Sequence, residues 1–267
     1  MVAPFGSSAA TRPEPMRADV SIGLPGTTPT EHLRVLAPRI ERLGFSALWL
    51  NDLPNGDSLA GLGVVAAETA TLRLATGVIP LDRRPADTLD LGGLPADRTM
   101  IGIGSGGAPR PLALVADGIA TLRRATPAPI VVGALGPRMR RLAAERADGV
   151  LFNWLTPGAA ADAVAELRAA AGERPVRAVL YVRTITEESA RPTLEREDQR
   201  YDAVPSYAAN FERLGIRAIE TTLAEGDRLA QFDVVDEVVL RAITPNGTLD
   251  ELERFVEDAA SWWARDA

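Results

Sequence analysis

The chain has 267 residues, of which 46% are hydrophobic and 24% charged, so it has enough apolar residues for a folded core and is not intrinsically disordered. It has no cysteine, its basic residues are all arginine, and its one histidine is His32, which excludes disulfide scaffolds, thiol nucleophiles, Schiff bases, Cys/His zinc sites and serine–histidine–aspartate triads. A net charge of −7 without a basic block argues against nucleic acid as the main partner.

The N-terminal end of the chain differs in composition from its body. Residues 1–17 are small, polar and proline-rich, and we predict a disordered tail there, followed by a single domain over 18–267. No run reaches the roughly 18 apolar residues that span a bilayer, and the first residues lack the apolar segment of a secretion signal. We therefore expect a cytoplasmic protein without membrane contact.

From Ala18 onward, short apolar runs alternate with amphipathic stretches. Two helices begin with capping-box patterns, at Thr28–Glu31 and Thr248–Glu251. The predicted elements in chain order are a strand over 20–24, a helix from 28, a strand over 45–50, a helix over 58–70, a strand over 72–79, a short segment over 85–97, a strand over 100–103, a helix over 111–124, a strand over 130–132, a helix over 137–146, a strand over 149–152, a helix over 159–171, a strand over 176–182, a helical region over 194–214 interrupted at Pro205, a strand over 234–243 and a last helix from 248.

The sum is eight strand–helix units in about 250 residues, which is typical of a (β/α)8 TIM barrel. The segments after the third and fourth strands are short, so we expect a compact barrel without long insertions. Ligand chemistry in such a barrel lies at the C-terminal ends of the strands. A doubly wound open sheet is the competing fold.

The most informative stretch runs from Pro129 to Pro157. An apolar strand over 130–132 leads into a turn with Gly133 and Gly136, after which Pro137 begins a helix. Glycines allow close backbone approach, and the free N–H groups of a helix start attract phosphate. With Arg138 beside the helix start, this turn is predicted to hold an anion.

Gly102 to Gly107 reads GIGSGG and matches the GxGxxG pattern of dinucleotide-binding folds. Pro109 and Pro111 delay the helix that should begin within the glycines, so we reject that interpretation. Two readings stay open: a strand end that leaves room for a flat ligand, and a tight turn.

Polar residues and a glycine also follow predicted strands. Asn51 or Asp52 would point into a barrel mouth and bind a heterocycle, or would merely form a turn. Gly77 marks a bulge or a close ligand approach. Arg183 and Arg241 end the last two strands, where barrels often hold phosphate and where a rim salt bridge is the alternative.

Four segments together, LGFSALWLND at 43–52, TGV at 76–78, IGIGSG at 101–106 and the stretch 129–157, resemble the luciferase-like monooxygenase superfamily, and most closely its F420-dependent actinobacterial branch. Their order and spacing cover nearly the whole chain. The resemblance implies a (β/α)8 barrel with F420 as its cofactor and FMN as the alternative. It also implies a homodimer. Trp262 and Trp263 could then lie in the dimer interface, or they could pack the last helix on its own barrel.

The resemblance implies where the ring of the cofactor would lie. It would rest on a bulge at Gly77 and Val78, where members often carry a non-proline cis peptide. Asp52 would approach the polar edge of the ring, and Asn153 would line the pocket. Asp52 and Asn153 are accordingly the predicted catalytic residues.

The rest of the cofactor is implied to follow the strand ends. Gly104, Ser105 and Gly106 would flank the ring or the ribityl chain. The ribityl chain and phosphate would bind the turn made of Gly133, Ala134, Leu135, Gly136, Pro137 and Arg138. No metal site is expected.

Two positions depart from the family pattern. Leu53 stands where F420-dependent sugar dehydrogenases carry a catalytic histidine, and Gly107 stands where they place a glutamate. No obvious general acid or base then remains in the mouth.

Three functions follow from these observations. The leading one is a flavin- or deazaflavin-dependent oxidoreductase that transfers hydride to, or oxygenates, a small organic substrate, served by a flavin or F420 reductase. The second is a non-catalytic flavin- or F420-binding relative that has lost the acid–base residues. The third is a phosphate-binding barrel enzyme without a flavin.

Overall fold

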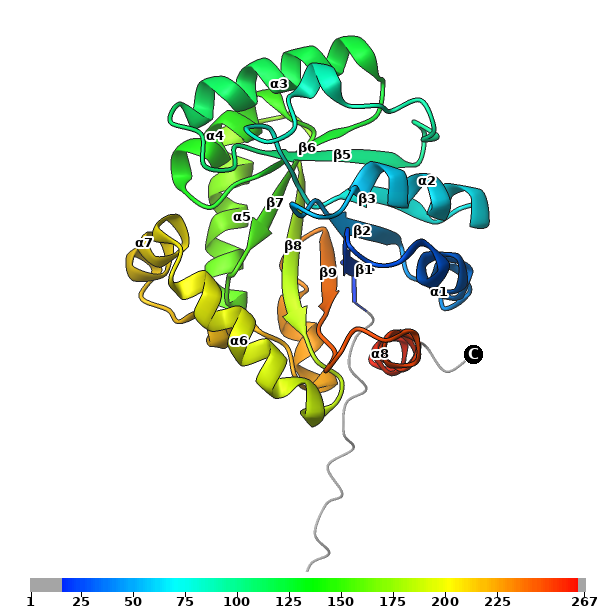
Figure 1. The fold of residues 1–267 in the computed structure, drawn as a ribbon. Coiled ribbons are helices and arrows are strands. Elements are labelled where there is room, and N and C mark those ends of the chain that lie inside the picture. Colours follow the sequence, from blue (N-terminus) through cyan, green and yellow to red (C-terminus); the bar gives the residue numbers. More distant parts are fainter. Residues whose placement is uncertain (1–15, 264–267) are drawn as a thin grey trace, which may run out of the picture.

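The computed structural model describes residues 16–263, which form a closed parallel barrel with helices around it (Figure 1). The strands are β1 (Asp19–Pro25), β2 (Ala47–Asn51), β3 (Arg73–Thr76), β4 (Ile79–Pro80), β5 (Thr99–Gly104), β6 (Ile130–Gly133), β7 (Gly149–Asn153), β8 (Arg177–Thr184) and β9 (Glu237–Ala242). The helices are α1 (Thr30–Arg42), α2 (Ser58–Glu68), α3 (Pro111–Ala125), α4 (Pro137–Arg146), α5 (Pro157–Ala171), α6 (Arg191–Asp202), α7 (Pro205–Leu214) and α8 (Leu249–Ser261).

Closure of the sheet confirms the predicted (β/α)8 barrel and rules out the open sheet. β1 pairs with both β2 and β9, and every neighbouring pair of strands runs parallel. β3 and β4 are the two parts of the third barrel strand, and both pair with β5. The chain between them, at Gly77 and Val78, contains the expected non-proline cis peptide.

Two irregular segments of the prediction are present. The short segment predicted over 85–97 has only a 3₁₀ helix, Ala86–Thr88, because prolines and the Gly92–Gly93 pair interrupt it. The region predicted over 194–214 with an interruption at Pro205 is two helices, since Pro205 begins α7. The longest connection in the barrel, 185–236 between β8 and β9, carries α6 and α7.

One of the two predicted capping boxes is present. Thr248 caps α8 and exchanges hydrogen bonds with Glu251. At α1 the prediction is wrong, because Pro29 is the N-cap and makes no side-chain cap bond. The hydroxyl of Thr28 instead donates to the carbonyl of Pro25 at 2.7 Å, so it closes the turn after β1.

Alternation along the strands divides the core into two parts. Residues of one parity pack between the barrel and the helices, and those of the other parity point into the barrel. The inward cluster is Ala47, Trp49, Ala75, Met100, Val131, Leu151, Val179, Tyr181 and Val239. This parity fixes which residues reach the mouth.

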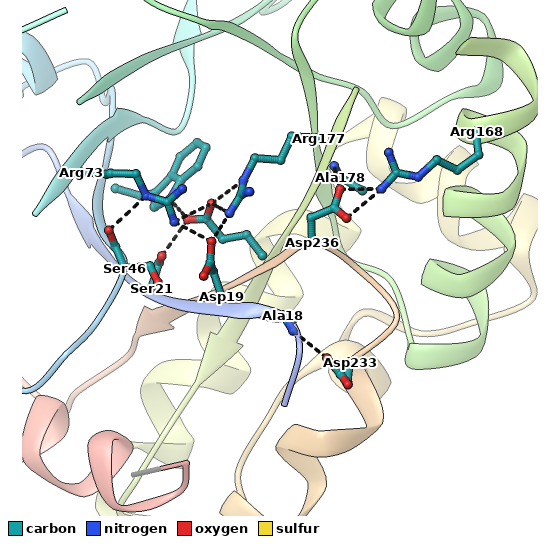
Figure 2. A network of polar contacts seen from close by, with 12 residues as sticks. Ala18, Asp19, Ser21, Ser46, Arg73, Arg168, Arg177, Ala178, Asp233 and Asp236 are labelled. Carbon is teal, nitrogen blue, oxygen red and sulfur yellow. Dashed lines mark hydrogen bonds and ion pairs between the residues drawn. The ribbon is translucent and has the colours of Figure 1, made fainter. Parts of the chain in front are cut away.

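The N-terminal end of the barrel is closed by charged side chains (Figure 2). Glu237 is completely buried, and its carboxylate accepts from the indole of Trp49 at 2.7 Å and the hydroxyl of Ser21 at 2.6 Å. Arg177 donates to the same carboxylate at 3.0 Å, and it also bonds Asp19. The network ties β1, β2, β8 and β9 together at the floor of the barrel.

The chain ends pack on the domain where they are described. Residues 1–15 of the predicted tail lie outside the described residues. The backbone N–H of Arg17 donates to the carboxylate of Asp233, and so does that of Ala18 (Figure 2). Trp263 packs edge-on against Phe45 with ring centroids 5.5 Å apart. The C-terminal tryptophan therefore docks the last helix on its own barrel. In the part of the chain that the structure describes, no helix has the length and apolar character needed to cross a membrane.

The floor network generates a stability prediction. Glu237→Ala should lower the free energy of unfolding by about 2–5 kcal/mol, because it leaves the buried indole N–H of Trp49 and the buried hydroxyl of Ser21 without their acceptor. Glu145→Ala is the matched control, since it removes a carboxylate from an exposed pair with Arg141 and should cost less than about 0.5 kcal/mol. Urea unfolding measures both, and equal losses in the two variants would show that the floor network adds no stability.

Candidate functional site

The inward residues at the C-terminal ends of the strands form two arcs. Gly77, Gly104 and Gly133 follow or end β3, β5 and β6, and we call them the glycine arc. The polar arc, on β2, β7, β8 and β9, consists of Asn51, Asn153, Arg183 and Arg241. The mouth of the barrel is therefore bare backbone on one side and hydrogen-bonding side chains on the other.

The side chain of Val78 fills the glycine arc. A Cβ atom at Gly104 would lie 2.8 Å from a methyl group of Val78, and one at Gly133 would lie 3.2 Å from both methyl groups. The two glycines are thus required for Val78 to pack between the strand ends. Val78 itself is half-buried, so it presents an apolar surface to the mouth.

The glycine-rich loop after β5 is a tight turn around Asp82. Gly106 has a φ of +56°, and a Cβ atom there would lie 1.9 Å from the carboxylate of Asp82. The N–H of Gly107 donates to that carboxylate at 2.8 Å, and Ser105 lies half-buried beside it. α3 begins only at Pro111, which agrees with the rejection of a dinucleotide fingerprint.

The turn between β6 and α4 has the properties of an anion site. Gly136 is the N-cap of α4, no side chain caps the helix, and a Cβ atom at Gly136 would meet nothing within 4 Å. The N–H groups of Arg138 and Met139 lie in the first helical turn and have no acceptor among the described residues. Arg138 is exposed beside them, so the donor set fits a phosphate. In the rest of the turn, Gly133 and Leu135 are half-buried and Pro137 is exposed. Ala134 is buried, and its N–H donates to the carbonyl of Leu151.

Asp52 is held by arginines. Its carboxylate accepts from Arg83 at 2.7 Å, from Arg84, and from the hydroxyl of Ser58 at 2.8 Å. Asp52 follows the parity of Leu50, which packs toward the helices, and its side chain is completely buried. These bonds fasten the loop after β4 to the start of α2, and the contact of Asp52 with a cofactor ring stays a prediction.

Asn51, one residue earlier, is the side chain of β2 that enters the mouth. Its Oδ1 accepts from the hydroxyl of Tyr181 at 2.9 Å and from Nε of Arg241 at 3.2 Å, and its Nδ2 donates to the carbonyl of Gly77. Asn51 therefore joins the polar arc to the glycine arc. The alternation from Trp49 to Asn51 is the sequence signal that distinguishes it from Asp52.

Helix α6 brings a carboxylate over the polar arc. Glu197 accepts from Nε of Arg183 at 3.0 Å, and its other oxygen lies 4.0 Å from Nη2 of Arg241. Arg183 also donates to Oδ1 of Asn153 and stacks on Trp154, with 3.9 Å from guanidinium carbon to ring centroid. The rim salt bridge considered for the arginines is thus present. Sequence reasoning missed Glu197, because nothing in the local pattern indicates that α6 packs over the mouth.

Tyr181, Tyr207 and Glu197, which lie beside the polar arc, each keep one charge state near neutral pH. Burial raises the pKa of Tyr181 far above its usual value and that of Tyr207 to about 12. Burial opposes ionisation of Glu197, yet Arg241 and Arg183 hold its pKa below the usual value. The arc therefore offers protonated tyrosines, an ionised carboxylate and two guanidinium groups.

Hollows lie at both ends of the barrel. One of about 260 Å³ lies at the floor, and its arginines bond carboxylates or backbone carbonyls. The other, of about 410 Å³, opens at the mouth beside the polar arc, and we call it the β1/β9 pocket. It is lined by Pro25, Thr27, Thr28, Pro29, Thr193, Glu197, Arg241, Ala242, Ile243, Thr244, Pro245, Asn246, Gly247 and Leu252.

Comparisons with known proteins agree with this architecture. A family model described as luciferase-like monooxygenase matches residues 3–118 and 113–265. The 5,10-methylenetetrahydromethanopterin reductase of Methanolobus tindarius is 29% identical over 153 residues, covering 42% of this chain and 47% of the relative. The matched part therefore spans about half the length of that curated protein.

Solved structures share the fold at low identity. The coenzyme F420 dependent tetrahydromethanopterin reductase from Methanopyrus kandleri has a TM-score of 0.65 at 19% identity, covering 91% of this chain and 98% of that one. The oxygenating constituent of 3,6-diketocamphane monooxygenase from the CAM plasmid of Pseudomonas putida, in complex with FMN, has a TM-score of 0.60 at 13% identity, covering 92% and 99%. Both superpositions extend over nearly the whole barrel.

Packing of the glycine arc can be tested by a compensating pair of substitutions. Gly104→Ala should destabilise the protein by about 1–3 kcal/mol, because its methyl group overlaps Val78. Adding Val78→Ala should recover part of that loss, whereas Gly93→Ala, in an exposed loop where a Cβ atom would meet nothing within 4 Å, should change stability by less than about 0.5 kcal/mol. Urea unfolding of the single and double variants gives the coupling energy, and strictly additive effects would contradict the contact.

Proposed function

Because this chain belongs to the luciferase-like monooxygenase family, we propose that it is a flavin- or deazaflavin-dependent oxidoreductase acting on a small organic substrate. F420 is the proposed cofactor and FMN the alternative. The names of the Methanolobus and Methanopyrus reductases support F420, and the FMN complex of the Pseudomonas protein supports FMN. The observation that carries the proposal is the pairing of an uncapped helix start with an apolar arc on one side of the barrel mouth.

The proposed phosphate site is the start of α4. The N–H groups of Arg138 and Met139, the guanidinium of Arg138 and the open backbone at Gly136 would bind the phosphate. A ribityl chain would follow the turn from Gly133. The phosphate would thus anchor the cofactor next to the glycine arc.

The proposed ring site lies on the glycine arc. Val78 offers an apolar surface against which a flat ring would pack, while Gly104, Ser105 and Gly106 would flank it. Asn153 would lie at the edge of the ring, and Asp52, whose carboxylate is held by Arg83 and Arg84, would support the loop behind it. The bound reduced cofactor supplies the hydride, and the barrel positions it and limits access of water.

The polar arc would bind and orient the substrate. Asn51 and Tyr181 form a neutral hydrogen-bonded pair, and the charge of Arg183 is fixed between Glu197 and Trp154. In this proposal the chain contributes binding and orientation, and the substrate or solvent carries the proton.

A non-catalytic cofactor-binding relative is the second candidate. Leu53 and Gly107 replace residues that serve catalysis in related sugar dehydrogenases, and Asp52 is fully engaged by Arg83 and Arg84. Oxidation of the bound reduced cofactor by added acceptors distinguishes the two candidates. Turnover supports the enzyme, whereas a stable complex that no acceptor oxidises supports the binder.

We also propose where the protein acts, how it assembles and which partner supplies its reduced cofactor. A cytoplasmic homodimer that receives reduced cofactor from a separate flavin or F420 reductase fits the absence of cysteine and the resemblance of the sequence to its family. The dimer is proposed on that resemblance, since Trp263 packs within its own chain.

Arg138→Ala tests the phosphate site. Loss of one charge-assisted contact of about 1.5–3 kcal/mol should weaken binding of F420 or FMN about 10- to 100-fold. Arg141→Ala is the control, because Arg141 lies on the same helix, is exposed and pairs with Glu145. Cofactor fluorescence in a titration of the apo-protein gives both affinities. Equal affinities of the two variants for the cofactor would show that its phosphate does not bind at the start of α4.

A further inference from the structure

The β1/β9 pocket lies on the opposite side of the mouth from the turn proposed for the cofactor phosphate. Its walls are the loops that follow β1 and β9, with Thr193 and Glu197 of α6 on a third side. A volume of about 410 Å³ is within the range of small-molecule sites. The pocket therefore has room for a small molecule beside a cofactor bound on the glycine arc.

The charge of Arg241 is only partly compensated at the pocket wall. Glu197 is the only acidic residue in the lining, and its carboxylate is hydrogen-bonded to Arg183, which lies outside the lining. The side chains of Arg241 and Glu197 are only 12% and 13% exposed, and 4.0 Å separates Nη2 of Arg241 from the carboxylate. The other polar side chains of the lining are threonines and Asn246.

Arg241 also has N–H groups that donate to none of the described residues. Its Nε donates to Asn51 and its Nη1 to the carbonyl of Ala242, which uses two of the five N–H groups of a guanidinium. The distance from Nη2 to Glu197, 4.0 Å, is longer than a hydrogen bond. The guanidinium is held in place by its neighbours, and part of its donor capacity is unused by the described residues.

We propose that the β1/β9 pocket binds an oxyanion group of the substrate, a carboxylate or a phosphate, and that Arg241 is the residue that recognises it. A guanidinium matches the geometry of two oxygens on one such group, which explains the choice of an anion over a neutral polar ligand. The hydroxyls of Thr28 and Thr193 already donate to the carbonyls of Pro25 and Pro245, so the guanidinium of Arg241 is the group that would supply donors to the anion. The inference rests on the proposed function, because the cofactor occupies the other arc and leaves this pocket to the substrate.

A phosphate group could come from the substrate or from the cofactor itself, and the test separates these sources. Inorganic phosphate is titrated into the protein and followed by ³¹P line broadening, and acetate is then added as a competing carboxylate. FMN and F420 are titrated separately by fluorescence. The variants are Arg241→Gln, Arg241→Lys, Arg138→Ala and the control Arg191→Gln, which removes a charge from an exposed pair with Glu188 at the start of α6.

The expected result is saturable phosphate binding that acetate reverses. Arg241→Gln should weaken phosphate binding at least tenfold and leave cofactor affinity unchanged, Arg241→Lys should lie between it and the native chain, and Arg191→Gln should have no effect. The far-ultraviolet circular dichroism of each variant establishes that it is folded, and the lysine variant serves as the test if the glutamine variant is not.

Three results would overturn the proposal. No phosphate binding, or phosphate binding that Arg241→Gln and Arg241→Lys leave unchanged, would show that Arg241 only supports the rim. If phosphate binding is lost in Arg138→Ala alone, the phosphate site is at the start of α4. A parallel loss of cofactor affinity in Arg241→Gln would assign the pocket to the cofactor's phosphate. Failure of FMN and F420 to bind while Arg241 still binds phosphate would remove the proposed function and leave the anion pocket.

Discussion

Closure of the parallel barrel is the constraint on which the whole mouth depends. Once the strands close, alternate residues must point inward, and each strand delivers one inward residue to the top layer. On β2 that residue is Asn51, although the neighbouring Asp52 has the more conspicuous side chain. The buried charge network at the other end, centred on Glu237, fixes the same register from below. The same alternation of inward and outward residues along the strands therefore determines which side chains lie at the floor and which lie at the mouth.

The two arcs of the mouth have different physical characters. The glycine arc is shaped by Val78, which needs the missing side chains at Gly104 and Gly133 in order to pack. The polar arc is shaped by Glu197, which holds Arg183 against Trp154 and leaves Arg241 with spare donors. A flat apolar group and an anionic polar group would thus bind on opposite sides of one opening, which is the arrangement a cofactor and its substrate need.

Local patterns were sufficient to predict the barrel and most helix boundaries, because strand parity, prolines and caps act over a few residues, whereas the family was predicted from the resemblance of four segments. The Thr248–Glu251 cap and the break at Pro205 are examples. Long-range packing was not predictable from such patterns. Glu197 reaches the polar arc only because α6 folds over the mouth, and the pairing of Asp52 with Arg83 and Arg84 joins two loops about thirty residues apart. The Thr28–Glu31 pattern failed because Thr28 bonds Pro25 within the turn.

We propose that the cofactor lies on the glycine arc and is anchored at the start of α4. Hydrogen–deuterium exchange of the apo-protein and of the protein saturated with F420, and separately with FMN, tests this placement. We expect slower exchange of the amides over 135–139, with little change over 242–247 in the β1/β9 pocket. Slower exchange confined to 242–247, or no change with either cofactor at saturating concentration, would contradict it.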